Sequence, residues 1–247
     1  MKKIAVCISK GGVGKTTTAV NLSAGLAMTG SKVLLVDTDT QDQAGSMLGI
    51  SQEAGLGEVI SGEAELTETI VQARDNLWLL SGGRTLAGAK RMISKKEFGG
   101  ENTIKEILAP LGKKYDYVIL DTAPGWDSLT VNVLFYAQEI LAPVSLELLT
   151  LKGLIRFSEN LAEIQKYHKK LTLKYILPTF MDGRVRKSAE ILSQLQTHYK
   201  KQLCSPIRYN VRLSETPGYG QTIYEYAPAS PGAEDYKRLT ERVIHDG

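Results

Sequence analysis

Two lysines and three glycines share the short segment 9–17, "SKGGVGKTT". Glycine has no Cβ, so the backbone N–H groups of such a segment can curl around phosphate oxygens. Lys15 can reach the β- and γ-phosphates of a nucleotide, and the hydroxyl of Thr16 is placed to ligate Mg²⁺. A predicted strand precedes the segment, and the helix predicted after it adds partial positive charge at its N-terminus. The segment therefore predicts a phosphate-binding loop rather than a glycine-rich turn without a ligand.

The other lysine of this segment, Lys10, has no obvious target in its own loop. The strict pattern G-x-x-x-x-G-K-[ST] has glycine at position 9, where this chain has Ser9, and Lys10 follows directly. One lysine is enough for the phosphates of one nucleotide, and Lys15 stands at the expected place. The residues alone leave the purpose of Lys10 open.

Carboxylates that could hold Mg²⁺ or position water end two of the predicted strands. Asp121 ends "YVILD", the usual place for an aspartate that holds the metal through water. Asp37 and Asp39 end "LLVDTD", and acids at i and i+2 point to the same side of a strand. Strand ends face the crevice where ligands bind in open α/β sheets. The pattern favours a catalytic over a structural role for Asp39 and leaves Asp37 evenly divided between the two.

Short apolar runs alternate with helical patterns along the chain. The runs read as strands that are buried on both faces, at 3–9, 32–39, 77–81, 117–122, 139–145 and 173–180. Helices are predicted at 15–29, 103–112, 128–137, 152–168, 186–200 and 232–245. The alternation predicts one α/β domain over residues 1–247, with a mostly parallel twisted sheet and helices on both faces. The polar stretch 82–101, which holds five glycines, is expected to be a flexible loop.

Cysteine and histidine usage argues against a disulfide framework or a transition-metal site. Cys7 and Cys204 match no zinc or redox spacing, which fits a reducing cytosol. The three histidines are too scattered to form a ligand cluster, at His168, His198 and His245. A cytoplasmic location is expected.

Charge and hydropathy limit the classes of partner that the chain is expected to bind. Residues 1–150 carry 14 Lys and Arg against 17 Asp and Glu, whereas residues 151–247 carry 16 against 10. A basic C-terminal part suggests a polyanion partner, although a solvated basic face explains it about equally well. No apolar run is long enough to span a bilayer, and the C-terminal "KRLTERVIHDG" is a poor membrane anchor.

Four segments together resemble the ParA/Soj/MinD group of deviant Walker ATPases, over nearly the whole chain. The loop "KGGVGKTT" carries the deviant lysine, "DTDTQ" is similar to the family's D-x-D-P-Q, and "DTAPG" is similar to its D-x-P-P. The tail "YNVRLSETPGYGQTIYEYAPASPGAEDY" looks closest to Soj-like partition ATPases. The resemblance implies a single-domain P-loop NTPase with ATP and Mg²⁺ as cofactors. No N-terminal helix-turn-helix is expected, because the chain starts at the first predicted strand.

The resemblance also implies roles for individual residues. Lys10 would reach the partner's nucleotide across an ATP-sandwich dimer, with Gly11 at the dimer contact. Lys10, Lys15 and Asp39 would be catalytic, Asp39 by orienting the attacking water. The phosphate loop would comprise Gly12, Val13, Gly14, Lys15, Thr16 and Thr17, and the metal would be held at Thr16, Asp39 and Asp121. Residues around the adenine would be Thr179, Phe180, Met181, Asp182 and Pro217, and residues on DNA would be Arg184 and Arg212.

The implied function is an ATP-dependent dimerisation switch. The dimer would bind DNA without sequence preference, on the nucleoid, and slow hydrolysis stimulated by a ParB-like partner would release it, so that plasmid or chromosome DNA is partitioned. ParA-like positioning of a non-DNA cargo and a MinD-like membrane-recruited ATPase are alternatives that share the ATP site. A nitrogenase-iron-protein-like reductase is disfavoured, because Cys7 lies inside a strand and Cys204 is far from it.

The sequence departs from the family pattern at three places. Thr40 replaces the usual proline, Asp42 and Gln43 replace the usual Gly-Asn, and "APGWD" stands where P-P-S is usual. These positions lie near the segments that sense the γ-phosphate, so hydrolysis rate and partner response are where differences are expected.

Overall fold

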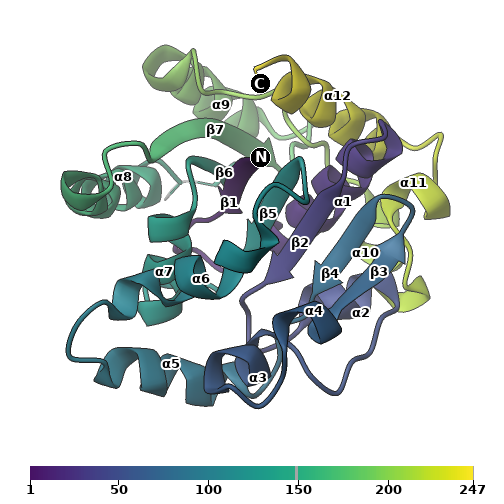
Figure 1. Ribbon diagram of the computed structural model, residues 1–247. Coiled ribbons are helices and arrows are strands. Elements are labelled where there is room, and N and C mark those ends of the chain that lie inside the picture. Colours follow the sequence, from purple (N-terminus) through teal and green to yellow (C-terminus); the bar gives the residue numbers. More distant parts are fainter. Residues whose placement is uncertain (148–149, 247) are drawn as a thin grey trace.

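A single seven-stranded sheet forms the centre of the molecule (Figure 1). The computed structural model describes residues 1–147 and 150–246. The strand order is β3-β4-β2-β5-β1-β6-β7, and every neighbouring pair is parallel except the antiparallel pair β3–β4. The strands are β1 (Lys2–Val6), β2 (Val33–Asp37), β3 (Ile70–Arg74), β4 (Leu77–Leu80), β5 (Tyr117–Asp121), β6 (Glu139–Ser145) and β7 (Thr172–Thr179).

Helices cover both faces of the sheet, and each face has its own apolar core. One face carries α1 (Lys15–Met28), α2 (Gln43–Leu48), α10 (Val211–Glu215), α11 (Ile223–Tyr226) and α12 (Pro231–His245). The other carries α3 (Leu56–Ser61), α4 (Leu66–Thr69), α5 (Leu86–Lys95), α6 (Thr103–Leu108), α7 (Ser128–Tyr136), α8 (Thr150–Tyr167) and α9 (Arg186–Tyr199). Three short 3₁₀ turns lie at Gly100–Asn102, Ala109–Leu111 and Thr216–Tyr219.

The continuous apolar runs of the sequence form the central strands because both of their faces are covered. Every residue of β2 is buried, and β5 is buried from its second residue on. A strand with helices on both sides has no solvent face, so it shows no alternation of polar and apolar residues. The α/β fold class predicted from the alternating pattern is confirmed.

The connections place several loops at one edge of the sheet. The chain moves from β1 to one side for β2 to β5, and to the other side for β6 and β7. In open α/β sheets the ligand site lies outside the carboxyl ends of the strands at such a reversal. The loops that follow β1, β2, β5 and β7 all leave from that edge.

The flexible loop expected over 82–101 is wrong for its central part. Residues Leu86–Lys95 form α5, whose side chains Leu86, Ala89 and Ile93 are buried in the core. Their spacing of three and four residues is that of a helix face, and the glycines at either end of the stretch obscured it. The helix predicted at 103–112 ends at Leu108 and continues as a 3₁₀ turn that contains Pro110.

The C-terminal helix α12 packs along α1 (Figure 1). Its apolar side chains Tyr236, Leu239 and Val243 are at most 3% exposed. The apolar side of α12 therefore serves the core. Among the described helices, none is both long and apolar enough to cross a membrane.

Candidate nucleotide site

A cleft of about 660 Å³ opens at the carboxyl edge of the sheet. This volume lies within the range of small-molecule and cofactor sites. Its walls come from the loops after β1, β2, β5 and β7 and from the segment that leads into α10. Sequence-predicted residues in its lining are Gly12, Gly14, Lys15, Thr16, Thr17, Asp39, Thr179 and Phe180.

The loop after β1 already has the shape of a phosphate cradle. Gly12 and Gly14 have φ of 69° and 84°, the left-handed region that glycine adopts without strain. Gly14 stands directly before α1, so the free N–H groups of the helix N-terminus open into the cleft. The carbonyl of Val13, which is buried, accepts the Thr179 hydroxyl at 3.0 Å and fixes the loop to β7.

Lys15 lies under this loop as a buried cation. Lys15 is only 6% exposed, and its Nζ donates to the carbonyl of Lys10 at 2.7 Å. Burial lowers the pKa of Lys15, and the nearby carboxyl of Asp121 opposes that shift. A buried ammonium with one neutral acceptor is a strong site for an anion, because an anionic ligand supplies the charge that the protein withholds.

Asp121 is the carboxylate that most clearly lacks a partner. It is fully buried, and neither oxygen accepts a hydrogen bond from residues 1–147 or 150–246. Burial raises the pKa of Asp121, whereas the nearby Thr16 hydroxyl and Lys15 lower it. Buried polar atoms without partners are rare in native proteins and call for an ion or water. The donor set therefore fits Mg²⁺, which takes oxygen ligands.

The other acids of the site divide into two roles. Asp39 is 9% exposed and lines the cleft, where Oδ1 accepts the N–H of Gln41 at 3.2 Å. Asp37 is fully buried and is used by the backbone, since its two oxygens accept the N–H groups of Asp39 at 2.7 Å and Ala44 at 3.0 Å. These two bonds favour the structural alternative for Asp37.

The predicted metal set is incomplete without a nucleotide. The described residues contain no group of three or more His, Cys, Asp or Glu that could hold a metal ion. Thr16 Oγ1 makes a long contact of 3.5 Å to Gln43 Oε1. Mg²⁺ is usually bound through one or two carboxylates together with substrate phosphates and water, so Thr16 with Asp121 and Asp39 is a suitable partial set.

The side chain of Lys10 points away from its own loop, toward the carboxyl end of β6. Its Nζ donates to Glu147 Oε2 at 2.6 Å and to Ser145 Oγ at 3.1 Å. The ammonium lowers the pKa of the Glu147 carboxyl. Both side chains are largely exposed, at 44% and 66%. Lys10 is therefore an accessible cation beside the cleft and does not belong to the cradle around Lys15.

Gly11 has room for a side chain within its own subunit. A Cβ at Gly11 would meet only side-chain carbons of Pro124, at 3.5 and 3.6 Å. The fold of one chain thus gives no reason for glycine here, and the dimer contact expected at Gly11 stays a prediction.

The residues expected around an adenine are only partly at the cleft. Thr179 and Phe180 line it, whereas Met181, Asp182 and Pro217 lie beyond the lining residues. Phe180 has φ of 55°, which is strained for an aromatic residue. Such strain is held only where the surroundings over-determine the backbone, and it gathers at ligand sites.

A second wall of the cleft was missed by sequence reasoning. It consists of Ile207, Arg208, Tyr209, Asn210, Leu213, Ser214 and Tyr236. The side-chain nitrogen of Asn210 is buried with no partner among the described residues, while its oxygen caps α10 by accepting the Arg212 N–H at 2.9 Å. The one sequence signal for this wall was the N-cap asparagine before a short helix. The rest lies some 190 residues from the phosphate loop and is joined to it only by folding.

The positions that depart from the family pattern also meet the cleft. Thr40 and Gln43 line it. Asp42 has φ of 47° and stands at the N-terminus of α2, where its carboxylate approaches Gly45. Burial raises the pKa of Asp42. The unusual residues therefore sit where the loop after β2 enters α2.

The two arginines expected on DNA are exposed and lie outside the cleft lining. Arg184 follows β7 with 86% of its side chain exposed and pairs with Asp182 at 2.7 Å. Arg212 lies in α10 with 59% exposed and pairs with Glu215 at 3.0 Å. Pairs this exposed are weak and easily exchanged for another anion.

Comparison with known proteins agrees with this site. The family model described as an AAA domain matches residues 1–174. The chromosome-partitioning ATPase Soj of Thermus thermophilus is 39% identical over 99% of this chain and 96% of its own length. The chromosome partitioning protein ParA of Myxococcus xanthus is 36% identical over 97% of this chain and 87% of its own.

A solved structure shows the same fold with a nucleotide. Cobyrinic acid a,c-diamide synthase from Mycobacterium smegmatis, with a bound ATP analog and magnesium, superposes with a TM-score of 0.85 at 29% identity, covering 99% of this chain and 94% of that one. The curated relatives match at higher identity over the full length. The chain therefore belongs to the AAA-domain family and, within the ParA/MinD superfamily, to the ParA/Soj-type ATPases.

Proposed function

We propose that this partition ATPase is a dimerisation switch that is closed by ATP and opened by hydrolysis. The cofactors are ATP and Mg²⁺. Lys15 and the N–H groups around Gly12 and Gly14 hold the phosphates, and Asp121 with Thr16 holds the metal. When bound, Mg²⁺ neutralises charge on the phosphate oxygens. Asp39, the acid that lines the cleft, orients the attacking water.

The position of Lys10 is the observation that supports the proposed dimer. A cation meant for its own nucleotide would lie in the cradle, as Lys15 does. Lys10 instead projects from the loop and is held at 2.6 Å by Glu147, a pair with both members exposed. A second subunit that docks at this edge would offer Lys10 the stronger charge of its triphosphate. A cation supplied in trans makes dimer formation depend on the γ-phosphate and accelerates phosphoryl transfer.

DNA is the proposed partner of the dimer. Arg184 and Arg212 are exposed, and residues 151–247 carry 16 Lys and Arg against 10 Asp and Glu. Dimerisation doubles the number of cations that one DNA molecule can contact, and nonspecific affinity rises steeply with that number. Hydrolysis stimulated by a ParB-like protein would release the DNA, which supports a role in partition on the nucleoid.

Two variants that should shift dimer formation in opposite directions test the proposed dimer. Lys10→Ala removes the trans cation, so it should bind ATP but elute as a monomer on a sizing column with ATP. Glu147→Gln releases Lys10 from its own subunit, so it should form the ATP-dependent dimer at a lower protein concentration than wild type. Binding of a fluorescent ATP analogue, measured in parallel, shows that each cleft still takes nucleotide.

An unchanged dimer in Lys10→Ala would overturn the role given to Lys10. Equal elution of wild type with ATP and with ADP would overturn the switch itself.

A further inference from the structure

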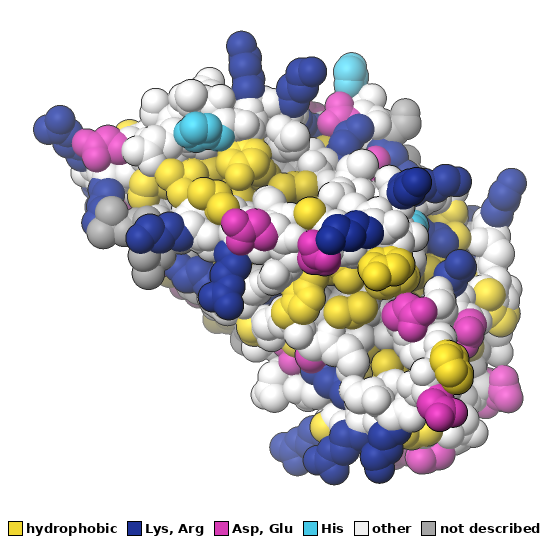
Figure 2. Space-filling model, turned by 90° about the vertical axis from the view of Figure 1, so that its left-hand side faces the viewer, with side chains coloured by type: hydrophobic (Ala, Val, Ile, Leu, Met, Phe, Trp, Pro, Cys, Tyr) yellow, Lys and Arg dark blue, Asp and Glu magenta, His cyan; other side chains and the backbone are white. Residues whose placement is uncertain are grey.

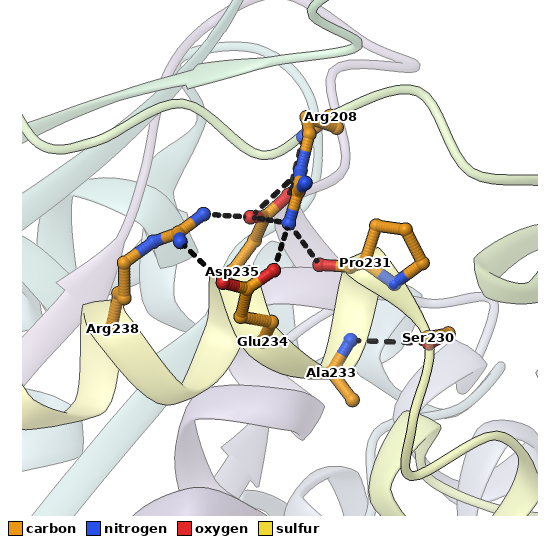
Figure 3. A network of polar contacts seen from close by, with 7 residues as sticks. All are labelled: Arg208, Ser230, Pro231, Ala233, Glu234, Asp235 and Arg238. Atoms are coloured by element: carbon orange, nitrogen blue, oxygen red, sulfur yellow. Dashed lines mark hydrogen bonds and ion pairs between the residues drawn. The ribbon is translucent and has the colours of Figure 1, made fainter.

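The buried carboxylate of Asp235, near the start of α12, accepts hydrogen bonds from Arg208 in the second wall of the cleft (Figure 3). Asp235 is 1% exposed, although it lies one turn from the helix N-terminus. It accepts hydrogen bonds from Arg208 and from the guanidinium of Arg238, which lies one turn further along α12. Figure 3 shows the two guanidinium groups converging on Asp235 from opposite sides.

Asp235 holds Arg208 by both its backbone and its side chain. Oδ2 accepts the Arg208 N–H at 2.8 Å and Nε at 3.0 Å, and Oδ1 accepts Nη2 at 2.8 Å. The same Nη2 donates to the carbonyl of Pro231 at 3.2 Å and approaches Glu234 at 2.5 Å. A bidentate charge-assisted pair fixes direction as well as distance. The extra bond to the N–H of Arg208 fixes the main chain, which a side-chain pair alone does not do.

The main chain that is fixed in this way forms the cleft wall. The segment from Ile207 to Tyr209 runs beside the end of β7, where Met181 donates to the Ile207 carbonyl at 3.0 Å and accepts the Tyr209 N–H at 2.9 Å. Ile207, Arg208 and Tyr209 all line the cleft. Two clamps thus act on one short segment, with β7 on one side and Asp235 on the other.

The first turns of α12 also contact the rest of this wall and the helix α1 that follows the phosphate loop. A Cβ on Gly232 would come within 2.9 Å of Asn210 and 3.0 Å of Leu213, so α12 lies directly behind these residues. The next residue after the buried acid, Tyr236, shares a hydrogen bond of 3.2 Å with Thr18 of α1. Asp235 therefore sits on a helix that touches the phosphate-loop helix and the opposite wall together.

We infer that Asp235 is a positioning residue that holds the segment 207–210 as a preformed wall for the base and ribose end of ATP. The inference rests on the proposed placement of the base at Thr179 and Phe180, away from the phosphate cradle. An acid with two guanidinium partners stabilises the wall without touching the nucleotide. A wall that is ordered before binding spares the ligand the entropy of ordering it.

The test separates the base end of ATP from its phosphates. Asp235→Asn keeps the size of the side chain but turns one acceptor into a donor that faces Arg208. Affinities for ATP and for inorganic tripolyphosphate are measured with Mg²⁺ by competition against a fluorescent nucleotide, below the melting temperature of the variant. We expect the Kd for ATP to rise by about fivefold or more, as for lost preorganisation, and the Kd for tripolyphosphate to stay within about twofold of wild type.

Two further variants keep the result decisive. Glu241→Gln is the matched control, since it alters an exposed acid of α12 that lies outside the cleft lining and outside the Asp235 network, and it should leave both affinities unchanged. If Asp235→Asn does not fold, Arg238→Met removes the other guanidinium partner of Asp235 from outside the cleft lining and should weaken ATP binding more than tripolyphosphate binding.

Each outcome has one meaning. Equal weakening of ATP and tripolyphosphate, or no weakening of either, overturns the positioning role of Asp235. Wild-type protein that binds tripolyphosphate as tightly as ATP overturns the proposed placement of the base instead.

Discussion

Asp121 shows at the scale of one residue how the site trades stability for binding. Its carboxylate is fully buried, both oxygens lack partners in the described chain, and burial raises its pKa. A buried unpaired acceptor destabilises the folded state until a cation or proton satisfies it. The neighbouring Asp37 avoids this cost because two backbone N–H groups bind it. The difference between the two acids is one of partners, since both end strands at the same edge of the sheet.

Replacing Asp121 by Asn should therefore stabilise the empty protein and weaken the loaded one. We expect the free energy of unfolding without ligand to rise by about 1 kcal/mol, because the neutral amide no longer buries a charge, although its polar atoms stay without partners. Thermal melting with and without Mg²⁺ and ATP measures both effects, since the wild type should gain much more from the ligands than the variant. Asp37→Asn serves as control and should lower stability without ligand. A nucleotide-free Asp121→Asn that melts below wild type would contradict this account of the site.

At the scale of elements, α5, the helix that sequence reasoning missed, is joined to α7 by Asp127. Asp127 caps α7, where Oδ1 accepts the Thr130 N–H at 2.8 Å, and Oδ2 pairs with Lys90 of α5 at 2.6 Å. Lys90 also lines the cleft. The cap and the ion pair together order α5 against α7 beside the nucleotide, over a stretch whose ends are glycine-rich loops.

Two substitutions at Asp127 separate the cap from the charge. Asp127→Asn keeps an acceptor for Thr130 but loses the Lys90 pair, and should cost less than about 1 kcal/mol because the pair is partly exposed. Asp127→Ala loses the cap as well and should cost about 1 kcal/mol more. Burial raises the pKa of Asp127, but the hydrogen bonds from Lys90 and Thr130 outweigh it and leave the pKa lowered.

The lowered pKa fixes the pH dependence of this difference. An acid whose folded pKa lies below its unfolded value stabilises the fold above the unfolded pKa, which is about 4 for Asp. The advantage of wild type over Asp127→Asn should hold from neutral pH down to about pH 5, decline from about pH 4, and vanish once the pH is below the lowered folded pKa. Urea unfolding across this range measures it. An advantage that grows on acidification would show that the charge of Asp127 is not what stabilises α5 and α7.

The elements that could be predicted from the sequence are those whose local pattern of apolar residues reflects their burial. Six strands and the long helices were found because a strand buried on both faces is apolar throughout. The edge strand β3 was missed because "IVQAR" carries polar residues on an exposed edge, and α5 because flanking glycines hid its period. The phosphate side of the site was read from one continuous segment. The wall at 207–210 could not be, since its role comes from contacts with β7 and α12.

Charge is the property that belongs to the whole molecule. On the face in Figure 2, Lys and Arg side chains project along the outline with Asp and Glu among them, so that face presents no single basic surface. The excess of cations over residues 151–247 is expected to act around Arg184 and Arg212. Each arginine now holds an acid of its own chain, and a DNA phosphate would replace that acid.

Wild-type protein should retain duplex DNA of unrelated sequences in a gel shift with ATP and not with ADP, and less so as salt rises. Arg212→Ala should weaken this binding equally on every sequence while ATP turnover is kept. In the dimer, which would lose two arginines, it should reduce the slope of log affinity against log salt by about 2. Lys166→Ala is the matched control, because Lys166 is 63% exposed and paired with Glu163 at the end of α8 that leads into β7, away from the cleft edge. Loss of ATP turnover in Arg212→Ala would place that arginine in the nucleotide site, and equal DNA binding with ATP and ADP would remove nucleotide control of the basic surface.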